Sequence, residues 1–186
     1  MNKGDKKADL VCDSPGSGSP RWSQYSNGDG TFNKMGAQEH SFCHKDDIVN
    51  YADLNGDGSM DIICSNDSGE HSAVFLDGKG NSLETAVDRI IIATGFCVGH
   101  PGKVQFADIN GDGLQDMLCD YGGSHWAQYS LGNGKFTDLG LWKGDWCGQP
   151  HANVNWVDIT GDGIAEMICD DWKTGGHWAY HFQARV

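Results

Sequence analysis

An acidic segment of nine residues recurs along this chain at an interval close to 50 residues, and it constrains the fold more than any other feature. It reads DLNGDGSMD at 53–61, DINGDGLQD at 108–116 and DITGDGIAE at 158–166, while NKGDKKAD at 2–9 is a diverged copy. The central aspartates Asp5, Asp57, Asp112 and Asp162 are spaced 50 to 55 residues apart. A fixed period of this length is the signature of a repeat architecture.

The similarity between the copies extends well beyond the acidic segments. Each one is followed by a short apolar run that ends in a cysteine and then by a second run (RWSQYS, HSAVFL, HWAQYS, HWAYHF). In the first three copies a Gly-rich turn and an aromatic–Cys pair come next. The sequence therefore predicts one repeat domain over 1–186, with repeats near 1–47, 48–101, 102–151 and 152–186. The first strand of the first repeat and the last strand of the final repeat are expected to be missing.

Each repeat contains about four short segments with strand-like patterns, separated by turn residues. In 152–157, alternation places Val154 and Trp156 on one face and Asn155 and Val157 on the other. The segment 82–93 is the one candidate helix, but its Ile run favours a strand. The expected fold is all-β, a β-propeller-like array of about four four-stranded antiparallel blades. A β-sandwich is the alternative, and the pattern leaves open whether the ring is open, closed or completed by oligomerisation.

The acidic segments place an oxygen-bearing side chain at positions 1, 3, 5 and 9. Glycines at positions 4 and 6 tolerate positive φ and let the chain curl, so the oxygens can converge. Hard oxygen ligands without Cys or His favour calcium. The backbone carbonyl at position 7 should complete each site, which predicts about three Ca²⁺ ions held by Asp53, Asn55, Asp57, Ser59 and Asp61; by Asp108, Asn110, Asp112, Leu114 and Asp116; and by Asp158, Thr160, Asp162, Ile164 and Glu166.

An EF-hand and a plain hairpin turn are the two other structures that such acidic segments could form. An EF-hand requires a glutamate at position 12, where this chain has Cys64, Cys119 and Cys169. A plain Asp/Asn/Gly hairpin turn is possible for one copy. Three copies in register argue against it, because clustered carboxylates repel unless a cation lies between them. The copy at 2–9 contains lysines and is expected to be metal-free.

These repeated Asp-x-Asn-Gly-Asp-Gly-x-x-Asp segments between strands resemble the FG-GAP/VCBS repeat family. Members of that family form calcium-binding β-propellers in integrin α-chains and in bacterial and fungal lectins. The resemblance implies Ca²⁺ at the positions named above and a binding role rather than a catalytic one. Partners would be a carbohydrate, a glycoconjugate or an extracellular protein. The letters FG-GAP themselves are absent from this sequence.

The seven cysteines allow two regular disulfide patterns. In the first pattern, Cys43–Cys64, Cys97–Cys119 and Cys147–Cys169 have nearly equal sequence separations. In the second pattern the pairs are Cys12–Cys43, Cys64–Cys97 and Cys119–Cys147. The first pattern is more even and leaves Cys12 unpaired. Buried free thiols are the third possibility.

Three tryptophans occupy equivalent positions in the second run of their repeats: Trp22, Trp126 and Trp178. Packing between blades would explain them. Alternatively they form sugar-stacking platforms, with His125 and His177 as polar neighbours, because an aromatic ring packs well on the apolar face of a sugar.

Composition excludes several functions. The net charge is −13 and the 13 Lys and Arg form no cluster, which argues against nucleic-acid binding. The longest apolar run, Ile90–Ala93, is too short to cross a membrane, and Met1–Leu10 has no apolar core of a signal peptide. No catalytic motif is present, so the chain is not expected to be an enzyme. We expect a secreted carbohydrate-binding module, which could form a homo-oligomer; a structural or protein-interaction module is the alternative.

Overall fold

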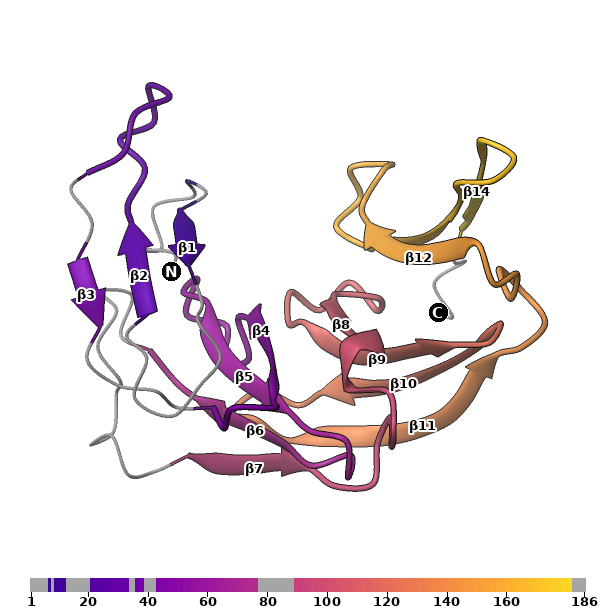
Figure 1. The fold of residues 1–186 in the computed structure, drawn as a ribbon, viewed down its shortest axis with the longest axis horizontal. Coiled ribbons are helices and arrows are strands. Elements are labelled where there is room, and N and C mark those ends of the chain that lie inside the picture. The colour runs from indigo at the N-terminus through magenta and orange to yellow at the C-terminus, as the bar shows by residue number, and fades with distance from the viewer. Residues whose placement is uncertain are drawn as a thin grey trace. The chain divides into compact units, whose positions relative to one another are not determined.

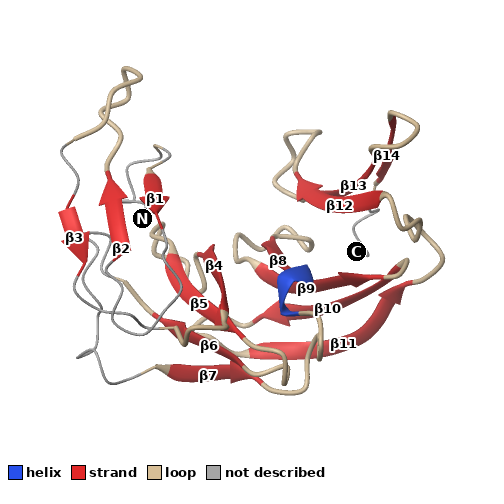
Figure 2. Cartoon of the chain, viewed as in Figure 1, coloured by secondary structure: helices blue, strands red, loops and turns tan. Residues whose placement is uncertain are grey.

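The chain folds into small antiparallel β-sheets joined by turns (Figure 1). The computed structural model describes residues 7, 9–12, 21–33, 36–38, 43–76 and 89–181. They divide into two compact units, Met1–Gly102 and Lys103–Val186. Among the described residues the helical content is one 3₁₀ turn, η1 (Pro101–Lys103), blue in Figure 2. No described helix has the length and apolar character needed to cross a membrane.

The first unit contains two sheets. One has the order β1-β2-β3, made of β1 (Leu10–Cys12), β2 (Arg21–Gln24) and β3 (Gly36–Gln38). The other has the order β4-β5-β6-β7, made of β4 (Ile48–Ala52), β5 (Asp61–Ser65), β6 (His71–Val74) and β7 (Ile90–Ala93). A core cluster of Ile62, Val74 and Leu76 packs against Tyr25 from the end of β2. Residues 82–88 of the segment expected to be a strand lie outside the described residues, and 90–93 form β7.

The second unit also contains two sheets. One has the order β11-β10-β9-β8, made of β8 (Val104–Ala107), β9 (Asp116–Tyr121), β10 (Ser124–Ser130) and β11 (Phe136–Lys143). The other has the order β12-β13-β14, made of β12 (Ala152–Val157), β13 (Glu166–Asp171) and β14 (Gly176–Tyr180). Burial alternates along β12 as the sequence predicts, with Val154 and Trp156 more buried than Asn155 and Val157.

The two sheets of the second unit pack face to face. Trp156 of β12 lies in a cluster with Leu118, Ala127 and Ala165, and its ring is 5.8 Å from that of Trp142. A direct backbone bond also joins the two acidic loops, from Ala165 N to the Asp108 carbonyl at 2.7 Å. The first strand and the acidic loop of the last sheet therefore contact the preceding sheet of this unit.

The sequence prediction of an all-β, propeller-like array of antiparallel blades is confirmed. Every pairing among the described strands is antiparallel and follows chain order. Short turns are enough to join strands in this way, and the frequent glycines of the sequence supply them.

Candidate functional site: acidic loops, histidine clamps and exposed tryptophans

The three acidic segments form tight loops between the first two strands of their sheets. In each one the position-1 carboxylate accepts backbone hydrogen bonds from positions 4 and 6. Asp53 accepts from Gly56 at 2.8 Å and from Gly58 at 2.7 Å. The two glycines have φ of 75° and 82°, a conformation that other residues rarely adopt. Asp108 and Asp158 repeat the arrangement with their own glycines.

Side chains at positions 3 and 5 are hydrogen-bonded to each other in the first two loops. Asn55 Nδ2 donates to Asp57 Oδ2 at 3.2 Å, and Asn110 donates to Asp112 at 2.9 Å. In the third loop Thr160 Oγ1 lies 3.4 Å from Asp158 Oδ1 instead. Oxygens from positions 1, 3 and 5 are thus gathered within one turn of chain at the surface.

The position-9 carboxylates are placed differently from the others, since they are buried and bonded to the backbone. Asp61 accepts hydrogen bonds from Leu54 N and Leu76 N, both at 3.0 Å, and is completely buried. Asp116 accepts from Ile109 N and Ser130 N, at 3.0 and 2.8 Å. Each carboxylate therefore ties its loop to the turn that follows the third strand of the same sheet.

The electrostatics of these buried carboxylates reflect the acidic groups around them. Burial raises the pKa of Asp61 from 3.8 to about 7, a net value to which the charges of Asp57 and Asp53 contribute and which the two backbone hydrogen bonds oppose. Burial likewise raises the pKa of Asp116 to about 6, again with contributions from Asp112 and Asp108. The position-9 carboxylate is therefore close enough to the carboxylates at positions 1 and 5 for their negative charges to raise its pKa.

A carboxylate at position 9 has the same structural role in the first repeat. Asp9 Oδ1 accepts from Ser26 N at 2.8 Å, which matches the bond between Asp116 and Ser130 N. The segment 2–9 is predicted to be metal-free, so this carboxylate bonds to the backbone in a repeat where no ion is expected. Sequence reasoning assigned position 9 to metal binding alone and missed this second role.

The donor set of the three loops fits a calcium ion. All the side-chain donors are carboxylate, amide or hydroxyl oxygens, which are the ligands that Ca²⁺ prefers. Each bonded oxygen of Asp61 and Asp116 accepts one hydrogen bond from a backbone N–H, and a carboxylate oxygen has two acceptor sites. Position 9 therefore keeps acceptor capacity toward the loop.

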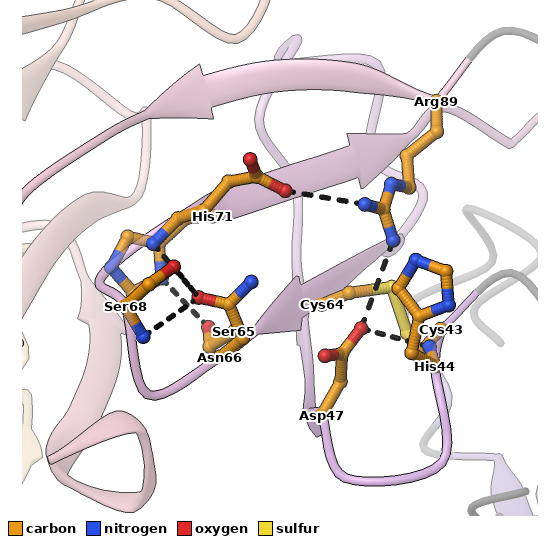
Figure 3. Close-up of polar contacts among 10 residues, drawn as sticks. Cys43, His44, Asp47, Cys64, Ser65, Asn66, Ser68, His71 and Arg89 are labelled. Carbon is orange, nitrogen blue, oxygen red and sulfur yellow. Dashed lines mark hydrogen bonds and ion pairs between the residues drawn. A yellow bond between two sulfur atoms is a disulfide. The ribbon is translucent and has the colours of Figure 1, made fainter. Parts of the chain in front are cut away.

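Two buried histidines form a second recurring feature, which we call the histidine clamp. His71 at the beginning of β6 bonds through Nδ1 to Ser65 Oγ at 2.9 Å (Figure 3). Its Nε2 bonds to the Phe96 carbonyl at 2.8 Å. His125 at the beginning of β10 bonds through Nε2 to the Trp146 carbonyl at 3.0 Å and through Nδ1 to Asp120 at 2.6 Å. Each clamp holds the backbone of an aromatic–Cys pair.

The clamp at Asp120 also reaches the neighbouring sheet of the same unit. Asp120 Oδ2 accepts from Trp156 Nε1 at 2.8 Å and from Gln105 Nε2 at 3.2 Å. Gln105 Nε2 in turn donates to the Val154 carbonyl at 2.8 Å. The sequence contains a signal for this hub: an Asp directly follows the cysteine in three repeats, and a His begins the second run in three.

The tryptophans and histidines proposed as sugar platforms lie in different surroundings. His125 is buried with both nitrogens bonded, and Trp126 is half-buried. Trp178 is 48% exposed, and the His177 side chain is exposed as well. Because Trp178 pairs with Cys169 and His177 with Asp170, the two side chains point to opposite faces of the sheet. The side chain of Trp22 lies outside the described residues.

The most exposed large apolar side chain of the described part is Trp172, at 72%. It lies in the turn between β13 and β14. The His151 ring packs edge-on against it at 6.1 Å, and His151 Nε2 is 3.2 Å from the buried Asp171 carboxylate. This turn therefore presents to solvent an aromatic ring that packs against His151, and the same hairpin carries the exposed Trp178.

The disulfides follow the more even of the two predicted patterns. Cys43–Cys64 and Cys147–Cys169 are bonded, Cys97 and Cys119 are also disulfide-bonded, and the exposed Cys12 is free. A carboxylate oxygen of Asp47 lies within 4.8 Å of the sulfurs of Cys43 and Cys64, and Arg89 Nη1 lies 3.7 Å from Asp47 Oδ2. Figure 3 shows this group of residues. Because both sulfurs are joined to each other, this group offers no metal site.

Comparisons with known proteins identify the architecture. A lectin from Agrocybe aegerita that recognises non-reducing terminal N-acetylglucosamine superposes with a TM-score of 0.68 at 22% identity, over 96% of this chain and 50% of the lectin. The Photorhabdus luminescens Tc holotoxin pore gives 0.68 at 16% identity, over 95% of this chain and 8% of that one. At these identities the likeness is one of fold. A search of curated protein sequences gave no significant match.

Family membership rests on the repeats. This chain spans about half the length of the lectin. Disulfides and repeats of this kind are typical of extracellular proteins. A model described as the FG-GAP-like repeat matches residues 3–64, 53–119 and 108–169, so this chain belongs to the FG-GAP-like repeat family.

Proposed function

We propose that this chain is a non-catalytic, calcium-binding propeller module of a secreted or surface protein, and that it binds carbohydrate. The observation that carries the calcium part is the threefold repetition of one oxygen-rich loop. In each copy, glycines at positive φ curl the chain around the position-1 carboxylate. Calcium would be held by positions 1, 3, 5 and 9 and by the position-7 carbonyl, where it would neutralise mutually repelling carboxylates.

Calcium binding is tested by calorimetric titration of the chelator-treated protein. About three ions should bind. Free calcium at about 100 times the dissociation constant should stabilise the fold by roughly 2.7 kcal/mol for each independent site. An unchanged melting temperature with EDTA and with excess calcium would reject this part of the proposal.

The two kinds of carboxylate in each loop allow a matched pair of variants. Asp57→Ala removes an exposed position-5 ligand and should abolish one site, with little effect on stability in EDTA. Asp61→Ala removes a buried acceptor of two backbone N–H groups, so it should destabilise the protein even in EDTA. Equal stability of the two variants in EDTA would contradict the double role of position 9.

Carbohydrate binding is supported by the hairpin that joins β13 to β14. Trp172 and Trp178 both expose indole surface there, and an exposed aromatic ring is suited to stacking on a sugar. The similar fold of a lectin that recognises terminal N-acetylglucosamine makes this sugar the first ligand to test.

A glycan array probed with the calcium-loaded protein should show binding to glycans that end in N-acetylglucosamine. Trp172→Ala or Trp178→Ala should weaken that binding about tenfold, a loss of about 1.4 kcal/mol. Leu141→Ala is the matched control, because Leu141 is an exposed apolar residue of the same unit at 60% exposure. If no glycan binds, or if all three variants behave alike, the chain is better described as a structural or protein-interaction module.

A further inference from the structure

The acidic loops at 108–116 and 158–166, which we call the second and third loops, are bonded directly to each other. Ala165, at position 8 of the third loop, donates its backbone N–H to the Asp108 carbonyl at 2.7 Å. Asp108 is position 1 of the second loop, and its carboxylate accepts hydrogen bonds from two glycine N–H groups of that loop, at 2.6 and 2.7 Å. The third loop therefore holds the main chain of the residue around which the second loop curls.

A packing contact accompanies this hydrogen bond. Ile164, at position 7 of the third loop, lies over Gly111 of the second, where an added Cβ would be 3.1 Å from Ile164 Cγ1. Ala165 is buried in the cluster that contains Ala107 and Ile109, the residues on either side of position 1 in the second loop. Because the contact is closely packed, a movement of one loop at this point disturbs the other.

Burial around position 1 differs between the two loops. Its neighbours in the second loop, Ala107 and Ile109, are 6% and 5% exposed. In the third loop its neighbours are Val157 and Ile159, at 46% and 51%. The contact with Ala165 therefore shields the main chain of the second loop here, and Ile159 is an apolar residue of the third loop outside that contact.

One peptide group takes part in both loops. Its carbonyl belongs to Ile164 and is the position-7 ligand proposed for the third loop, and its N–H belongs to Ala165 and bonds to Asp108. The carbonyl and the N–H of a planar trans peptide point in opposite directions, so the two roles are compatible. When the carbonyl serves as a ligand, the N–H becomes a stronger donor, because hydrogen-bonded dipoles polarise one another.

We propose that Ile164 and Ala165 act as positioning residues for the second loop, so that the second and third loops bind calcium as a coupled pair. This inference rests on the calcium binding proposed above. When the third loop is ordered around its ion, the shared peptide group is fixed, and the main chain of Asp108 is fixed with it. The second loop then loses less conformational freedom on binding its own ion. Coupling of this kind is reciprocal and is typically about fivefold or more in affinity.

Calcium titration of a set of loop variants tests the coupling. Asp57→Ala is present throughout and removes the first site; Asp112→Ala then leaves only the third loop able to bind, and Asp162→Ala leaves only the second. With both loops intact, the product of the two association constants should exceed the product of the two single-loop constants by about fivefold or more. Equal products overturn the coupling and leave calcium binding standing, whereas a complete lack of binding overturns the proposed function as well.

Two isoleucines of the third loop provide a matched pair of variants. Ile164→Ala keeps the backbone carbonyl and removes the packing over Gly111, so the ratio of the two products should fall toward one. Ile159→Ala removes an exposed side chain of the same size and should preserve the ratio. The same ratio in both variants would overturn the role of Ile164. Thermal melts in EDTA that match the parent protein confirm that each variant is folded.

Amide hydrogen exchange, followed by NMR, reports on the loop that holds no ion. In the Asp57→Ala, Asp162→Ala protein, calcium can bind only to the second loop. The Ala165 amide belongs to the third loop, yet it should exchange about fivefold or more slowly once calcium is added, because its acceptor on Asp108 is then better ordered. An unchanged exchange rate at Ala165, in a protein that binds one calcium ion, overturns the proposal.

Discussion

The sheets β4–β7 and β8–β11 share one geometry but hold their buried histidines by different chemistry. In the first, the Phe96 carbonyl accepts from Nε2, so a neutral ring can accept the Ser65 hydroxyl at Nδ1. In the second, the two ring nitrogens face the Trp146 carbonyl and the Asp120 carboxylate. The repeat thus preserves the position of the clamp and changes the partner of Nδ1 from a hydroxyl to a carboxylate.

The consequences of this difference reach beyond the histidine. Asp120 has enough acceptor capacity to serve Gln105 and Trp156 as well, and so it joins two sheets. In the first sheet, where Ser65 takes the place of Asp120, the buried Nδ2 of Asn50, equivalent to Gln105, has no hydrogen-bond partner. One substitution at the residue after the cysteine therefore separates a local clamp from an interface hub.

The largest expected effect comes from removing the acceptor of each clamp. Asp120→Ala removes the acceptor of three hydrogen bonds and should lower the free energy of unfolding by roughly 3–5 kcal/mol, as expected when one partner of a buried pair is lost. Ser65→Ala breaks one bond and should cost about 1–3 kcal/mol. Urea unfolding followed by tryptophan fluorescence suits Asp120→Ala, because six of the seven tryptophans lie in the second unit. Equal losses would contradict the distinction between hub and clamp.

Sequence alone was sufficient for the parts of the molecule that repeat locally. Strand order, the loops with their glycines and the disulfide pattern all depend on residues close together in one repeat. The roles of Asp61 and Asp120 depend on partners brought in from elsewhere: Leu76, fifteen residues on, and Trp156, in the following sheet. An acidic residue in an acidic motif gives no sign that its oxygens face backbone amides, so position 9 was interpreted only as a ligand.

Disulfide removal should lower the free energy of unfolding by similar amounts in the two units, because the same kind of bond closes a loop of nearly the same length in each. Cys43–Cys64 and Cys147–Cys169 close loops of 21 and 22 residues. Chain entropy predicts a loss of about 3 kcal/mol for each paired Cys→Ser variant. Urea unfolding of both double variants measures it. A much larger loss for Cys43–Cys64 would show that the adjacent Asp47–Arg89 pair depends on the bond.

Turn glycines test the geometry that the two clamps share. The Gly69 carbonyl accepts a hydrogen bond from Phe96 N and the Gly123 carbonyl accepts one from Trp146 N, and both glycines have positive φ. A Cβ at Gly69 would lie 2.7 Å from the Phe96 carbonyl oxygen, and at Gly123 it would lie 2.9 Å from Gly148 Cα. Gly69→Ala and Gly123→Ala should each cost at least about 1–2 kcal/mol, since an L-residue is strained there. Gly122→Ala, with positive φ but open space, should cost less in thermal melts.

The smallest effect expected is the pH response of the neutral clamp. Burial lowers the pKa of His71 below 6.5, so the unfolded chain binds a proton more readily than the folded one. Stability from this site is therefore complete above about pH 6.5 and falls as the solution becomes more acidic. Hydrogen exchange of β5 and β6 across this range measures the loss, and His71→Gln should remove it.

Ser65→Asp would convert the first clamp into the chemistry of the second. A carboxylate beside His71 favours the protonated ring, so the pKa of His71 should rise and the acid-induced loss should shrink or reverse. The same carboxylate could accept from Asn50 Nδ2, as Asp120 accepts from Gln105. An NMR titration of the His71 ring measures the shift directly. If the pKa of His71 stays low in this variant, the residue after the cysteine does not set the charge of the clamp.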